Sequence, residues 1–229
     1  MTSVSETELR AEIVRTCLRM VELGINQGTS GNVSARSGER FLITPSGIPY
    51  EEMTPEQIAV MDVDGTYRGP CKPTTEWRIH AAIMRERPAA GVVIHTHSLY
   101  ATTVACLRRA IPALHYYVAV GGGPTIPCAE YATYGTPELA ASALAALHGR
   151  DACLLANHGL LVVGATLGET LRRTFDVEIL ARQYVYALSA GEPSILPDDE
   201  IERVRLKMRT YGTQEADDPG LVRLDAPPA

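Results

Sequence analysis

Residues 91–97 read GVVIHTH, an apolar run that ends in two histidines. A short run of this composition is typical of a strand buried in a sheet. Because successive side chains of a strand point to opposite faces, His95 and His97 point to the same face. Two neutral imidazoles placed in this way can bind one divalent ion, although most isolated pairs of this kind are structural or surface residues. The run therefore predicts a sheet with a candidate metal site at the end of one strand.

On both sides of this run, short apolar segments alternate with segments whose apolar residues recur at helical spacing. The sequence predicts strands at residues 33–36, 41–44, 58–62, 153–156 and 160–163, and helices at residues 6–23, 75–87, 98–107, 138–147, 168–190 and 198–209. Asp64-Gly65 indicates a hairpin turn and hence antiparallel pairing. Since no repeat or linker divides the chain, we expect one α/β domain with a mixed sheet and a loosely attached polar tail at residues 213–229.

The composition argues against several classes of protein. The 229 residues include 27 acidic and 21 basic side chains, and the resulting net charge of -6 disfavours a general nucleic-acid binder. No apolar run approaches the roughly 20 residues of a membrane-spanning helix, and the N-terminal residues are acidic where a signal peptide is apolar. The five cysteines are scattered and form no C-x-x-C pair. We therefore expect a reduced, cytoplasmic protein that binds neither nucleic acid nor membranes.

Two further residues extend the histidine pair. His158 lies in an Asn-His-Gly turn between two predicted strands, and three histidines with an open coordination position are the pattern of a catalytic zinc centre. Glu76, at the start of the predicted helix 75–87, is a candidate fourth ligand or acid/base. The alternative for Glu76 is an acidic residue in a first helical turn, stabilised there by the helix dipole. The other histidines are interpreted as structural or surface residues, namely His80, His115 and His148.

Three turns rich in small residues are candidates for phosphate binding. Residues 29–32 (TSGN), 44–47 (TPSG) and 74–75 (TT) offer hydroxyls and backbone N–H groups of the kind that cradle phosphate. Each alone is more often an ordinary loop. Neither the P-loop lysine motif nor G-x-G-x-x-G occurs, so nucleotide binding has no support, and Gly121-Gly122-Gly123 is interpreted as a closely packed turn.

Seven segments together resemble the class II, zinc-dependent aldolase family. They are QGTSGNVSAR (27–36), TPSGIPYEEM (44–53), PTTEWRIHAAIMRERP (73–88), HTHSLYAT (95–102), IPALHYYVAVGGG (111–123), IPCAEYATYGT (126–136) and NHGLLVVG (157–164). The resemblance continues weakly into residues 210–212, and the tail lies outside it. It implies a single domain at residues 1–212, a three-layer α/β/α sandwich with a mixed, mostly antiparallel sheet, assembled as a homotetramer.

The resemblance also implies a role for each site residue. His95, His97 and His158 would hold Zn²⁺, with Glu76 as the fourth ligand and, once substrate displaces it, the acid/base. Tyr116 of a neighbouring subunit would donate a proton to the aldehyde oxygen, and Tyr211 would cover the site. The substrate phosphate would contact the turn residues Thr29, Gly31, Asn32, Ser46, Gly47, Thr74 and Thr75.

The implied activity is the reversible cleavage of a ketose 1-phosphate to dihydroxyacetone phosphate and an aldehyde. L-Fuculose 1-phosphate and the 5-deoxy- and 5-methylthio-ribulose 1-phosphates are the candidate substrates. Within the family, ribulose-phosphate 4-epimerases typically carry aspartate at the position of Glu76, whereas sugar-acid phosphate decarboxylases share the glutamate. A catalytically inactive binding module would lack the histidines. No lysine has an evident role as a Schiff-base nucleophile, so a metal route is preferred over a covalent one.

Overall fold

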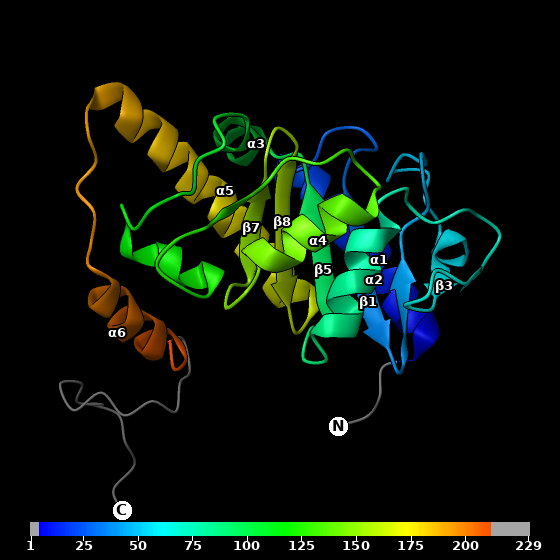
Figure 1. The fold of residues 1–229 in the computed structure, drawn as a ribbon. Coiled ribbons are helices and arrows are strands. Elements are labelled where there is room, and N and C mark those ends of the chain that lie inside the picture. The colour runs from blue at the N-terminus through cyan, green and yellow to red at the C-terminus, as the bar shows by residue number, and fades with distance from the viewer. Residues whose placement is uncertain (1–4, 212–229) are drawn as a thin grey trace, which may run out of the picture.

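A single eight-stranded sheet forms the centre of the protein in the computed structural model, which describes residues 5–211 (Figure 1). The strand order across the sheet is β4-β3-β2-β1-β5-β8-β7-β6. The strands are β1 (Asn32–Ser37), β2 (Arg40–Ile43), β3 (Ala59–Met61), β4 (Tyr67–Arg68), β5 (Val92–Thr96), β6 (Cys128–Ala129), β7 (Ala152–Leu155) and β8 (Gly159–Gly164). The tail predicted at residues 213–229 lies outside the described residues.

Helices cover both faces of this sheet. Helices α2 and α4 pack together in front of the sheet in Figure 1, whereas α1 lies behind it. The helices are α1 (Glu6–Glu22), α2 (Trp77–Glu86), α3 (Leu99–Cys106), α4 (Pro137–Ala146), α5 (Leu167–Ala190) and α6 (Asp198–Met208), with the 3₁₀ helices η1 (Pro55–Gln57) and η2 (Tyr116–Gly121). Within residues 5–211, no helix is both long and apolar enough to cross a membrane.

The sheet is mixed and mostly antiparallel, as expected. Every neighbouring pair of strands runs antiparallel except β6 and β7, which are parallel. Strand β5 lies between β1 and β8, and its register places His95 opposite Asn32 on one side and Leu161 on the other. The run at residues 91–97 therefore forms a central strand, and its two neighbours come from distant parts of the chain.

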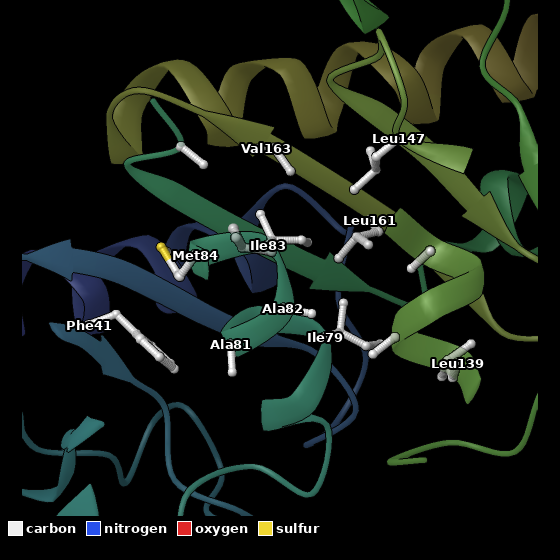
Figure 2. Close-up of a cluster of buried hydrophobic side chains, with 14 of the residues drawn as sticks. Phe41, Ile79, Ala81, Ala82, Ile83, Met84, Leu139, Leu147, Leu161 and Val163 are labelled. Carbon is white, nitrogen blue, oxygen red and sulfur yellow. The ribbon is translucent and has the colours of Figure 1, made fainter. Parts of the chain in front are cut away.

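The three layers are held together by alternating side chains of the buried strands. On β8, Leu161 and Val163 pack toward α2 and α4, whereas Leu160 and Val162 pack toward α3 and α5. Figure 2 shows the first of these clusters, in which Ile83 of α2 lies beside Leu161 and Val163. Full burial of each such side chain contributes about 1.5–3 kcal/mol, so both helical layers are fixed tightly to the sheet.

The predicted helices and longer strands are confirmed within one or two residues of their ends. Ser5 and Glu8 form the capping box expected at the start of α1. The predicted helix 75–87 begins two residues later, at Trp77, because the N–H of Trp77 closes a turn onto the carbonyl of Thr74 and Glu76 becomes the N-cap residue. The hairpin turn predicted at Asp64-Gly65 is confirmed, since it joins the antiparallel strands β3 and β4. The two-residue strand β6 and the helices η1 and η2 were not predicted, since such short segments carry no periodicity.

Candidate functional site

Four potential metal ligands meet at one end of the sheet. His95 ends β5, His97 follows it, His158 lies in the β7–β8 turn, and Glu76 caps α2. One ligand atom from each of the four lies within 4.8 Å of all the others. The three imidazole rings are mutually edge-to-face, with ring centroids 4.8–4.9 Å apart. The prediction that His95 and His97 share a face is therefore confirmed, and the fold adds Glu76 and His158 to the pair.

The atoms at the centre of this group are arranged for coordination. His95 Nε2 lies 3.0 Å from His97 Nε2 and 3.1 Å from Glu76 Oε2, and His158 Nε2 lies 3.2 Å from Glu76 Oε1. His95 Nδ1 donates a hydrogen bond to the carbonyl of Leu160 at 3.0 Å. Because a carbonyl only accepts, this bond places the proton of His95 on Nδ1 and directs the lone pair of Nε2 toward the other ligands.

The local backbone explains how the two strand ends come together. Thr96, between the two histidines, points to the opposite face and donates to the carbonyl of Ile25. In the β7–β8 turn, Asn157 adopts a left-handed conformation with φ of 53°. Gly159 is required next to it, since a Cβ atom there would lie 2.5 Å from the carbonyl oxygen of Thr96 and 2.9 Å from the ring of His97. The turn therefore places His158 next to the end of β5.

The electrostatics of the group suit a cation. Burial alone would raise the pKa of Glu76, but the adjacent His95 and His158 imidazoles outweigh burial and hold that pKa well below its usual value. Burial, together with the same two imidazoles, lowers the pKa of His97 to about 4, so His97 is neutral at pH 7. Glu76 Oε1 is buried without a hydrogen bond. Three imidazoles and one carboxylate form a donor set that binds a divalent metal, and these residues fit one.

A pocket of about 350 Å³ opens above Glu76, His97 and His158. All residues that were expected to bind phosphate line it, namely Thr29, Gly31, Asn32, Ser46, Gly47, Thr74 and Thr75. The backbone N–H groups of Gly31, Gly47 and Thr75 donate to no other described residue, so they are available to an anion. Asn32 differs from the rest because its side-chain amide is already bonded to Glu76.

Two aromatic residues of the pocket were not singled out from the sequence. Tyr131 and Tyr134 follow β6 and line the pocket together with the small-residue turns, with 54% and 66% of their surface exposed. Their loop has no periodicity, and the one available signal was two tyrosines in a polar segment. They give the outer part of the pocket an apolar wall.

The two tyrosines that were expected near the metal lie elsewhere in their own chain. Tyr116 begins η2 and is 49% exposed, and Tyr211 follows α6 and is 85% exposed. Neither lines the pocket. Helix α6 packs on η2, so both tyrosines belong to the same end of the molecule, away from β1–β4 in Figure 1. Their catalytic roles remain predictions that require a second subunit.

Comparisons with known proteins agree with this geometry. The model of the class II aldolase and adducin N-terminal domain family matches residues 11–185. A 5-methylthioribulose-1-phosphate/5-deoxyribulose-1-phosphate aldolase of Rhodospirillum rubrum is 46% identical over 98% of this chain and 99% of its own. An L-fuculose phosphate aldolase of Escherichia coli is 44% identical over 91% of this chain and 98% of its own. A solved L-fuculose 1-phosphate aldolase superimposes with a TM-score of 0.87 and 38% identity, over 91% of this chain and 100% of that one.

Proposed function

Since this chain belongs to the class II aldolase family and is a carbon–carbon lyase, we propose that it reversibly cleaves a ketose 1-phosphate to dihydroxyacetone phosphate and an aldehyde. The observation that carries the proposal is one pocket that combines an ionised carboxylate among three imidazoles with free backbone N–H groups. The carboxylate and imidazoles suit a metal and carbon–carbon bond chemistry, and the backbone N–H groups suit the phosphate. The pocket of about 350 Å³ that both groups line is large enough for a small phosphorylated sugar.

We propose Zn²⁺ as the metal, held by His95, His97, His158 and Glu76. The support is the set of three imidazoles and one carboxylate and their compact arrangement, which suit the small coordination number of zinc. Zn²⁺, when bound, supplies positive charge that stabilises the enediolate left when the carbon–carbon bond breaks.

The protein's own residues then move the protons. In the direction of synthesis, Glu76 Oε1 accepts the proton from C3 of dihydroxyacetone phosphate, because this oxygen belongs to an ionised carboxylate and is not the one that Asn32 binds. Tyr116 of a neighbouring subunit donates a proton to the aldehyde oxygen, and Tyr211 covers the site and excludes water. Cleavage is the reverse of these steps.

We further propose a cytoplasmic homotetramer with active sites at its subunit interfaces. The support for shared sites is that Tyr116 and Tyr211 are exposed and lie outside the pocket of their own chain. The support for a reducing compartment is that all five cysteines are free, among them the buried Cys17 and Cys153. An active monomer in light scattering at assay concentration would contradict the shared site.

The phosphate turns are proposed to hold the substrate at the end remote from the aldehyde. Gly31, Gly47 and Thr75 contribute backbone N–H groups, and the remaining hydroxyls come from Thr29, Ser46 and Thr74. The aldehyde portion then faces Tyr131 and Tyr134, whose apolar rings suit a deoxy or methylthio group as well as a sugar methyl group. Both named relatives are about equally similar, so the identity of the aldehyde is the question that the assay must answer.

The decisive experiment is a screen of ketose 1-phosphates coupled to detection of dihydroxyacetone phosphate. It includes the L-fuculose, L-rhamnulose, 5-deoxyribulose and 5-methylthioribulose forms, with a ribulose 5-phosphate and a 4-phosphotetronate to detect epimerase or decarboxylase activity. We expect cleavage of at least one ketose 1-phosphate and none of the unphosphorylated sugars at equal concentration. Equal rates with and without the phosphate would contradict the phosphate site, and turnover of the epimerase or decarboxylase substrate alone would contradict the aldolase assignment.

A further inference from the structure

A chain of buried hydrogen bonds runs from β1 to the carboxylate of Glu76. Asn32 Nδ2 donates to Glu76 Oε2 at 2.9 Å, and His80 Nε2 lies 2.6 Å from Asn32 Oδ1. The other ring nitrogen of His80, Nδ1, lies 2.7 Å from Ser34 Oγ. All three residues behind Glu76 are buried, with exposed fractions of 2% for Asn32, at the pocket wall, and 0% for His80 and Ser34.

The chemistry of these groups fixes the direction of every bond in this chain. A carboxylate only accepts, so Asn32 presents its NH₂ to Glu76 and its carbonyl oxygen to His80. His80 must then carry its proton on Nε2 and accept the hydroxyl proton of Ser34 at Nδ1. Burial lowers the pKa of His80 to about 3, which agrees with a neutral ring that has one donor and one acceptor.

The chain leaves the two oxygens of Glu76 in different states. Oε2 accepts the Asn32 amide, whereas Oε1 is buried, accepts nothing from Asn32 and lies 3.2 Å from His158 Nε2. Glu76 and His80 are four residues apart and therefore lie on one face at the start of α2, while Asn32 and Ser34 lie on one face of β1. The hydrogen bonds thus connect the helix that carries the carboxylate to the strand next to His95.

We propose that Ser34, His80 and Asn32 position the Glu76 carboxylate, holding Oε2 so that Oε1 is the oxygen that exchanges the proton. This inference rests on the proposed function and assigns the Asn32 side chain to Glu76 rather than to the substrate phosphate. The three residues are positioning residues, since the hydrogen bonds of this chain end on Glu76 and act through it. The Asn32 bond would hold the carboxylate at the pocket whether or not Glu76 is also a ligand of the metal.

Two substitutions at His80 separate this role from a general structural one. In His80→Gln, the side-chain amide reaches the position of Nε2 and can still donate to Asn32. In His80→Asn, the shorter amide reaches only the position of Nδ1 and contacts Ser34 instead. Both replacements are neutral, polar and smaller than histidine, so they form a matched pair that differs in the bond to Asn32.

We expect His80→Gln to retain kcat within about threefold of wild type and His80→Asn to lose about 10- to 100-fold, the effect of one hydrogen bond to a charged group. KM should change less than twofold in both variants, because neither touches the phosphate turns. In Co²⁺-substituted protein, the visible absorption spectrum should match wild type for His80→Gln and differ for His80→Asn, with one metal per chain in both. Asn32→Ala should lower kcat as His80→Asn does, again with KM nearly unchanged.

Two results would overturn the proposal. One is an equal loss of kcat, metal and melting temperature in the two His80 variants, which would indicate a purely structural histidine. The other is an Asn32→Ala enzyme with raised KM and unchanged kcat, which would place the Asn32 amide on the phosphate. If wild type cleaves no ketose 1-phosphate, the proposed function fails, while the Co²⁺ spectra of the His80 pair still decide whether the chain positions Glu76.

Discussion

Glu178 offers a direct test of how the fold supports the metal site. This residue of α5 is buried, with 7% of its surface exposed, and it accepts three hydrogen bonds. The donors are Ser98 Oγ at 2.7 Å and the backbone N–H groups of Tyr100 and Ala101, each at 2.8 Å. The carboxylate therefore satisfies the N-terminus of α3, which begins two residues after His97. We predict that replacing Glu178 lowers both the free energy of unfolding and the affinity for the metal.

The size of the effect follows from the three donors. Glu178→Ala leaves two backbone N–H groups and one hydroxyl without their acceptor, and each unsatisfied group costs about 1–3 kcal/mol. Water entering the space that the side chain vacates satisfies part of this loss. We therefore expect a decrease of about 3–5 kcal/mol in the free energy of unfolding, comparable to the loss of a buried charge partner. For a chain of this length the melting temperature should fall by about 10 °C.

Urea and thermal unfolding of the purified protein measure this change, and competition with a chelator measures metal affinity. Metal affinity should fall about tenfold. Ser98, which directly follows the proposed ligand His97, is the N-cap residue of α3 and donates to Glu178, so loss of Glu178 loosens the backbone beside His97. Glu178→Gln keeps the shape but loses the charge and one acceptor, so it should lie between wild type and Glu178→Ala. Glu192→Gln, at an exposed position just beyond α5, is the matched control and should change stability by less than about 0.5 kcal/mol. A Glu178→Ala protein as stable as the Glu192→Gln control would refute the capping role.

Three further predictions concern the active site. Glu76→Gln should keep most of the metal, because three imidazoles remain, but its kcat should fall at least about 100-fold. Metal analysis and steady-state kinetics measure both quantities. A wild-type kcat would show that Glu76 only starts a helix. The pKa of His80 is about 3 in the folded protein and about 6.5 when unfolded, so protonation favours unfolding below pH 6.5. Between pH 7 and 5, wild type should lose about 2 kcal/mol more unfolding free energy than His80→Gln, and parallel pH curves would contradict this. Tyr116→Phe should keep the metal content and the oligomeric state of wild type but have a lower kcat. A kcat equal to that of wild type would disprove the role of Tyr116.

Local sequence patterns are enough to predict the secondary structure and one face of the site. The capping box at Ser5, the glycine after α5 and the apolar runs around residues 91–97 and 160–163 are local signals, and each marks its element within one or two residues. The shared face of His95 and His97 follows from the period of a strand and needs no other part of the chain. The family resemblance then supplied what local patterns do not contain, including the three layers and the mostly antiparallel sheet.

Which distant residues meet depends on how the strands and helices assemble. His158 reaches His95 because β8 pairs with β5 in a register that sets Leu161 opposite His95, and the tight turn before Gly159 brings His158 to the strand end. Asn32 meets His80 because β1 is the other neighbour of β5 and α2 packs over it. His80 carries no signal in the sequence that distinguishes it from an ordinary helix residue. Such contacts depend on strand order and register, which arise from packing of the whole core rather than from any local period.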